Sequence, residues 1–338
     1  MAIGVAIACG PSAAIDSPAP HPVAPIDTTP LANSIRGLVG AFGGTAGVVI
    51  AFPGVPEPIY AANADTPFIA ASIYKLAVLL HVESLVESGT LSYDDTITIE
   101  DADVTVDGSN EPAGTTLTID DALEEMITYS DNGSALALLR LYGAPATNAK
   151  LAAAGIKGFH VAENADADHM VTARAVATFF DRLATRQLVS PAASDRMLAR
   201  LERQTINDRL PRDLPDGVLV AHKTGDLVGL IHDAGVIEAP DGPRIAVVLT
   251  SGGTDADARD LMARIGALAY SVVLVRPAAA QVESLPSPQT VWSRVGTGAA
   301  AGLFAIAILA LAWVFLARRS ARRRGGDRGE GSEPARPD

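Results

Sequence analysis

Ala71-Ser72-Ile73-Tyr74-Lys75 decides the fold and the chemistry of this chain, and the apolar run 76–80 follows it directly. The run predicts a helix over 72–87, which is apolar on most faces and is therefore expected at the centre of its domain. Lys75 lies three residues after Ser72, one helical turn along the same face. A nearby amine of lowered pKa can take the proton of a serine hydroxyl and make it nucleophilic. The same spacing is also typical of a helix-capping serine followed by a solvated lysine.

Hydrophobic patterns predict strands in two groups that lie far apart in the sequence. One group precedes Ser72, at 45–52 and 58–63, and the other comes late, at 218–222, 234–238 and 244–250. Helices are predicted at 31–42, 119–127, 133–141, 146–154, 173–184, 191–204 and 255–275. Strands at both ends with helices between them predict an α+β fold, in which one antiparallel sheet receives a mostly helical insertion.

Composition excludes several classes of function. The formal net charge of −13 argues against nucleic-acid binding. Cys9 is the single cysteine, so the chain cannot form an intrachain disulfide, and the six histidines show no metal-ligand spacing. We therefore expect no metal centre.

The N-terminal region reads as a processing segment followed by a linker. Residues 1–9 are apolar and end at Cys9, like a truncated signal with a lipobox-like end, although a basic region is missing. Cys9 is a candidate for lipidation, and the alternative is a truncated secretory signal with an incidental cysteine. Residues 10–30 are rich in Pro and Ala and predict an extended linker.

The C-terminal region predicts a membrane anchor. A second linker covers 276–294, and the uncharged apolar stretch 295–317 is long enough to span a bilayer. The arginine-rich tail 318–338 should remain cytoplasmic, which places the domain at 31–275 outside the membrane. The alternative for 295–317 is a buried core helix. These features predict a single-pass protein of the cell membrane with an extracytoplasmic, monomeric domain.

Two further motifs complete a signature. Ser130-Asp131-Asn132 and Lys223-Thr224-Gly225 follow the Ser-x-x-Lys motif in that order. Together the three motifs resemble those of the penicillin-recognising serine enzymes, and the region 31–275 is similar to class A β-lactamases and related serine hydrolases. The resemblance extends to Thr66-Pro67-Phe68 and His232-Asp233-Ala234-Gly235. It implies a five-stranded antiparallel sheet flanked by helices (an α/β/α sandwich), an all-helical lobe, a site in the cleft between them, and no cofactor.

The resemblance also implies the catalytic roles. Ser72 attacks a lactam carbonyl, and Lys75 accepts its proton. Ser130 passes a proton to the departing nitrogen. Lys223 binds the substrate carboxylate, and its charge holds down the pKa of Lys75. The backbone N–H groups of Ser72 and Asp226 form the oxyanion hole.

Substrate contacts follow from the same likeness. Asn132 holds the side-chain amide of the substrate, Thr224 binds its carboxylate, and Gly225 leaves the strand edge open. His232 is a candidate second carboxylate contact, with a packed or exposed histidine as the alternative. Asp131 is expected to fix its loop through backbone bonds.

The sequence departs from class A β-lactamases in the loop before Thr172. That family carries a glutamate there that activates the deacylating water. Glu163 is the candidate here, although the Asn expected four residues later is replaced by Ala167, and the alternative is an acidic surface loop. Three functions remain open: β-lactam hydrolysis; a penicillin-binding DD-peptidase or esterase that deacylates poorly; and a non-catalytic penicillin or peptidoglycan sensor. The partner in each case is a β-lactam or peptidoglycan-like small molecule.

Overall fold

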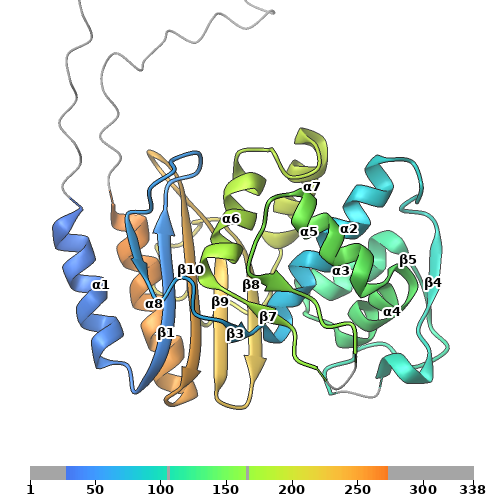
Figure 1. Cartoon of the computed structure of the whole chain (residues 1–338), viewed down its shortest axis with the longest axis horizontal. Helices are drawn as coiled ribbons and strands as arrows, with labels where there is room; N and C mark the ends of the chain where they lie inside the picture. Colours follow the sequence, from blue (N-terminus) through green and yellow to red (C-terminus); the bar gives the residue numbers. More distant parts are fainter. Residues whose placement is uncertain (1–27, 105–106, 165–166, 273–338) are drawn as a thin grey trace, which may run out of the picture. The chain divides into compact units, whose positions relative to one another are not determined.

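A five-stranded antiparallel sheet with the order β2-β1-β10-β9-β8 forms the centre of the fold (Figure 1). Its strands are β1 (Gly44–Ala51), β2 (Tyr60–Ala62), β8 (Val220–Leu227), β9 (Leu230–Ala239) and β10 (Gly242–Gly252). β1 pairs with β10, with Val48 opposite Val248, and this pairing joins the two distant parts of the sequence. The predicted α+β fold with a split sheet is therefore confirmed.

The structure, a computed structural model, describes residues 28–104, 107–164 and 167–272. They belong to one compact unit, Pro25–Val275. The predictions for the signal segment with Cys9, most of the first linker, the second linker, the membrane helix 295–317 and the tail lie outside the described residues. Within the described ranges, no helix has both the length and the apolar character needed to cross a bilayer.

Both faces of the sheet are covered by helices. Val48 and Ile50 of β1 belong to a core that also contains Ile35 of α1 (Thr29–Ala41) and Met262 of α8 (Asp255–Ser271). Neighbouring residues along a strand point to opposite faces, so Val49 enters the second core, which includes side chains of α6 (Ala173–Ala184) and of the helical lobe. A strand buried on both faces explains the uninterrupted apolar run of β1.

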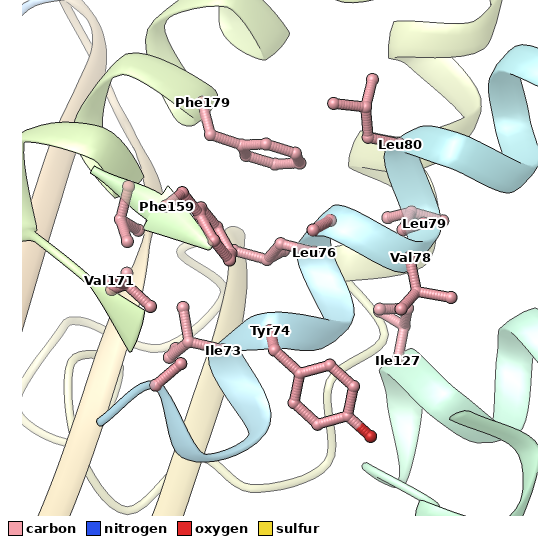
Figure 2. Close-up of a cluster of buried hydrophobic side chains, with 14 of the residues drawn as sticks. Ile73, Tyr74, Leu76, Val78, Leu79, Leu80, Ile127, Phe159, Val171 and Phe179 are labelled. Carbon is pink, nitrogen blue, oxygen red and sulfur yellow. The ribbon is translucent and has the colours of Figure 1, made fainter. Parts of the chain in front are cut away.

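The helix α2 (Lys75–Glu87) is the centre of the helical lobe, and its first nine residues are all buried. The other lobe helices are α3 (Ile119–Thr128), α4 (Asn132–Tyr142), α5 (Ala144–Ala153) and α7 (Pro191–Leu201). Figure 2 shows Leu76 and Leu79 of α2 in one cluster with Ile127 of α3, Phe159 and Phe179. Burial on every side holds the start of α2, and with it the nucleophile motif, in a fixed position.

Two boundaries differ from the sequence prediction. The α-helix begins at Lys75 rather than at Ser72, because residues 71–74 form a 3₁₀ turn, η1 (Ala71–Tyr74). β8 extends to Leu227, so Lys223-Thr224-Gly225 lies inside the strand and not at its end. The cause is a tight hairpin: Leu227 pairs with Leu230 of β9, and Gly229 supplies the positive φ that the turn needs.

Short elements complete the fold. They are β3 (Phe68–Ile69), β6 (Phe159–His160) and β7 (Met170–Val171) in one small sheet, β4 (Thr96–Thr98) and β5 (Thr116–Thr118) in another, and the turn η2 (Asp101–Val104). The pairing of β3 with β7 brings the loop before Thr172 next to the nucleophile turn.

Candidate active site

The nucleophile motif lies on a strained turn. Ala71 has a φ of 44°, in the left-handed region that residues other than glycine rarely adopt. Ser72 follows it in η1 and is half-buried. Backbone strain of this kind costs about 1–3 kcal/mol and persists only where surrounding contacts impose it. Here the buried start of α2 and the edge strand β8 fix the position of Ser72.

Ser130-Asp131-Asn132 connects α3 to α4. Ser130 also has a positive φ, 60°. The carboxylate of Asp131 caps α4, since Oδ1 accepts the N–H of Ser134 at 2.6 Å and Oδ2 accepts that of Asn110 at 2.5 Å. The expected structural role of Asp131 is therefore observed: it fixes the loop and leaves the two flanking side chains to face the site.

The amine of Lys75 is fully buried in this loop. Its Nζ donates to the carbonyl oxygen of Ser130 at 2.5 Å, to Asn132 Oδ1 at 2.7 Å and to Ser130 Oγ at 3.3 Å. The hydroxyl of Ser72 is not one of its partners among the described residues. Catalytic hydrogen bonds of unliganded enzymes often tighten only when substrate binds, so Lys75 remains suited to accept the proton of Ser72.

Burial sets the protonation of the two lysines. Desolvation lowers the pKa of Lys75 to about 7, against a smaller opposing effect of the Asp131 charge. The pKa of Lys223 is lowered by burial first and by the charge of Lys75 second. For Lys75 the first cause is burial, and the contribution expected from the Lys223 charge stays a prediction.

The hydroxyl of Ser130 lies between the two amines. Lys223 Nζ donates to Ser130 Oγ at 2.8 Å, and Lys75 Nζ approaches the same oxygen at 3.3 Å. When both amines carry their protons they only donate hydrogen bonds, so this oxygen then accepts and its own proton remains free for another acceptor. Ser130 is thus placed to give a proton to a departing group.

The strand β8 supplies the opposite wall. Thr224 Oγ1 is buried and has no hydrogen-bond partner among the described residues. A buried hydroxyl without a partner is costly, and a substrate oxygen would satisfy it. Asp226, two residues further along β8, lines a pocket together with Ser72.

Gly225 has a packing role that the sequence did not indicate. A Cβ on this residue would lie 3.2 Å from Ala71 Cβ and 3.3 Å from both Ala70 O and Ile73 Cγ1. Glycine at this position therefore lets β8 pack closely against the nucleophile turn. β8 is also the last strand of the sheet, so the open strand edge expected at Gly225 stays a prediction that is compatible with this packing.

The pocket around Ser72 has a volume of about 250 Å³. Besides Ser72 and Asp226, it is lined by Tyr74, Asn132, Leu136 and His169, among others. Tyr74 and His169 stack, with ring centroids 4.1 Å apart. The sequence did not identify His169 as a site residue, because no motif spacing links it to Ser72. The pairing of β3 with β7 brings it there.

His169 cannot serve as a general base in this arrangement. Its Nδ1 accepts the N–H of Ala162 at 2.9 Å, so the ring proton of the neutral form is on Nε2. Burial lowers the pKa of His169 to about 4, and the ring is therefore neutral at pH 7. Nδ1 is occupied and Nε2 carries a proton, which leaves the ring a hydrogen-bond donor toward the pocket.

The structure does not bring Glu163 to Ser72. Glu163 is exposed and lines a neighbouring cavity of about 750 Å³. Among the described residues of the loop, Asp168 is the acid that lines the pocket with Ser72.

His232 is buried in the domain core and does not face the pocket. One ring nitrogen, Nε2, lies 2.8 Å from the carbonyl oxygen of Ile69, and the other, Nδ1, accepts the N–H of Thr250 at 3.1 Å. A contact between His232 and substrate would break these bonds. Of the two alternatives, the packed histidine is the one that agrees with this geometry, and we leave His232 out of the proposed substrate site.

Known proteins share this arrangement. The family model of the beta-lactamase enzyme family matches residues 30–273, most of the chain. The chain belongs to this family. The beta-lactamase resemblance that the three motifs predict is therefore confirmed. Among the residues that the structure describes, no group of three metal-ligating side chains is present.

Individual beta-lactamases support the assignment. The chain is 30% identical to beta-lactamase VEB-1 of Pseudomonas aeruginosa over 210 residues, which are 55% of this chain and 70% of VEB-1. A beta-lactamase of Sphaerobacter thermophilus superposes with a TM-score of 0.66 at 28% identity, covering 70% of this chain and 95% of that chain. A mutant of PBP-A, solved as an acyl-enzyme complex with penicillin G, superposes with a TM-score of 0.65 at 25% identity, covering 72% and 95%.

Proposed function

We propose that this chain is a serine hydrolase that reacts with β-lactams through an acyl-enzyme at Ser72. The observation that carries the proposal is the position of Ser130 Oγ between two buried amines, 2.8 Å from Lys223 and 3.3 Å from Lys75. This hydroxyl has a free proton and lies beside an amine with a pKa near neutrality. Such an arrangement suits acyl transfer with protonation of a leaving nitrogen.

The acylation step follows from these positions. The neutral amine of Lys75 takes the proton of Ser72 while Ser72 Oγ bonds to the lactam carbonyl carbon. The N–H groups of Ser72 and Asp226 stabilise the oxyanion. The C–N bond then breaks, and the nitrogen takes the proton of Ser130, which Lys75 replaces. Thr224 Oγ1 binds an oxygen of the substrate on the leaving side.

Deacylation is the step that separates the candidate functions. We propose Asp168 as the base that activates water, because it lines the Ser72 pocket whereas Glu163 lines the neighbouring one. The second candidate function is a penicillin-binding peptidase or esterase that releases β-lactams slowly. It is favoured by the position of Glu163, which lines the neighbouring cavity and not the Ser72 pocket. We expect a shorter, exposed aspartate in place of the family's glutamate to activate water less well, so that turnover is slower.

Intact-protein mass spectrometry during reaction with benzylpenicillin tests the proposal. We expect a covalent adduct equal to the mass of the drug, absent from Ser72→Ala. Loss of the adduct with time, together with many turnovers of a chromogenic cephalosporin, indicates a β-lactamase. A persistent adduct indicates the slow-release alternative, and Asp168→Asn should lengthen the lifetime of the adduct with little effect on its formation. A folded wild type without an adduct would contradict the proposal.

We also propose that the domain is extracytoplasmic and tethered by the apolar segment 295–317. The support is sequence alone: the length of this segment and the arginines that follow it. Lipidation at Cys9 would add a second anchor.

A further inference from the structure

Four charged side chains form a closed ring of ion pairs behind the end of β8. Asp226 accepts from Arg209 at 2.5 Å and from Arg259 at 3.4 Å. Asp208 pairs with the same two arginines, at 3.1 Å from Arg209 and 2.9 Å from Arg259. Two positive and two negative charges meet within the ring, and Arg259 also lies 3.9 Å from Asp255 outside it.

Arg209 is held in this ring by the backbone as well. Its side chain is almost fully buried, and its Nη1 donates to the carbonyl oxygen of His232 at 2.9 Å and to that of Gly225 at 3.3 Å. These two residues face each other across β8 and β9. The guanidinium is therefore fixed directly behind the strand that carries Lys223, Thr224 and Gly225.

The two aspartates of the ring differ in one respect. Asp226 lines the pocket that contains Ser72, whereas Asp208 is not among the residues that line it. Asp226 is also 43% exposed. A residue that lines the pocket thus carries a partly exposed carboxylate, and this carboxylate neutralises Arg209 behind β8.

We propose that the carboxylate of Asp226 sets the charge preference of the site, so that it disfavours substrates with an anionic group on the leaving side. The inference rests on the proposed acyl-enzyme function and narrows its substrate class. The favoured substrates are lactams, amides or esters whose leaving side is uncharged, with Thr224 Oγ1 as the hydrogen-bonding group for an oxygen there. When the negative charge of Asp226 is removed, less of the positive charge of Arg209 is neutralised. The site should then bind substrates with a carboxylate more strongly.

Benzylpenicillin and its methyl ester test this inference, because they differ only in the charge on the leaving side. The second-order rate constant for adduct formation at Ser72 is measured for both compounds with the full-length protein. Each value is divided by the rate of alkaline hydrolysis of the same compound. Wild type, Asp226→Asn, Asp226→Ser and the matched control Asp208→Asn are compared, with melting temperatures to verify folding.

We expect wild type to react with the ester at least as fast as with the acid. The acid-to-ester ratio should rise about five- to tenfold in both Asp226 variants, as removal of a unit charge in a half-buried site predicts. Asp208→Asn breaks the same ring, but Asp208 does not line the pocket. The acid-to-ester ratio of this variant should therefore change less than twofold relative to wild type.

If an adduct still forms, any of three outcomes would overturn this inference and leave the proposed function intact. They are a wild type that strongly prefers the acid, an unchanged acid-to-ester ratio in folded Asp226 variants, or an equal rise of that ratio in Asp208→Asn. The wild-type comparison does not depend on the stability of any variant. Absence of an adduct with either compound would overturn the proposed function, and this inference with it.

Discussion

At the scale of single residues, burial is what makes the site reactive. A lysine in water keeps its proton at neutral pH, but Lys75 has no exposed surface and its pKa falls to about 7. A neutral amine is therefore accessible at neutral pH. The hydrogen bonds to Ser130 and Asn132 keep this amine in position without adding a compensating carboxylate contact.

The first prediction concerns pH. Because the neutral amine of Lys75 is the base, the acylation rate should rise about tenfold for each pH unit below 7 and level off above it. Lys75→Arg keeps the charge but cannot lose its proton, so acylation should fall by about 10²-fold or more at every pH. Stopped-flow acylation by benzylpenicillin between pH 5 and 9 measures both effects. A flat profile in a folded wild type would exclude Lys75 as the base.

At the scale of elements, the site depends on the close approach of β8 to the turn η1. Gly225 in β8 permits this approach because it has no Cβ. In η1 the facing residue is Ala71, whose φ is strained. A catalytic group displaced by even about 1 Å can lose about 10²-fold in rate. The contact between these two elements therefore matters more for activity than for the stability of the fold.

The second prediction follows from this contact. Gly225→Ala places a methyl group within 3.2–3.3 Å of the turn, so η1 must shift by a few tenths of an ångström. We expect the acylation rate to fall about tenfold or more, with a loss of about 1–2 kcal/mol in the free energy of unfolding. The control is Gly37→Ala in α1, where a Cβ meets no atom within 4 Å. Denaturant unfolding and acylation kinetics check both variants, and equal losses of activity in the two would contradict the prediction.

The sequence predicted the elements and the motif residues, but not the contacts that depend on tertiary structure. Ser72, Lys75, Ser130 and Lys223 belong to motifs whose residue types carry the chemistry, and their order along the chain was informative. Tyr74 and His169 meet only because two-residue strands pair, and such short strands leave no periodic signal. The resemblance makes His232 a candidate carboxylate contact with a packed histidine as the alternative, and only the tertiary structure shows that its ring is bonded to the backbone of Ile69 and Thr250.

At the scale of the whole molecule, charge and hydrophobicity are distributed unevenly along the chain. The tail 318–338 holds seven arginines, although the chain as a whole is acidic. The segment 295–317 before this tail is long and apolar in sequence. None of the helices of the described domain is long and apolar enough to span a bilayer. A membrane attachment through 295–317 is therefore a property to test in the full-length protein.

The third prediction is that the full-length protein stays in the membrane pellet after extraction with alkaline carbonate. A variant truncated after residue 275 should be released to the supernatant, provided that Cys9 is replaced by Ser to remove a lipid anchor. Quantitative blotting of both fractions provides the measurement. Release of the intact chain would contradict the proposed anchor.

The split sheet determines when the protein can acquire its native shape during synthesis. β1 is completed by residue 51, but its partner β10 begins only at residue 242. A chain that emerges from its N-terminus must keep an apolar strand, paired only with the short β2, until nearly all of the domain has been made. Contacts as distant in sequence as that of β1 with β10 form slowly. Nascent chains should therefore depend on chaperones until β10 emerges, and a ribosome stalled before residue 242 should carry a protease-sensitive, inactive polypeptide.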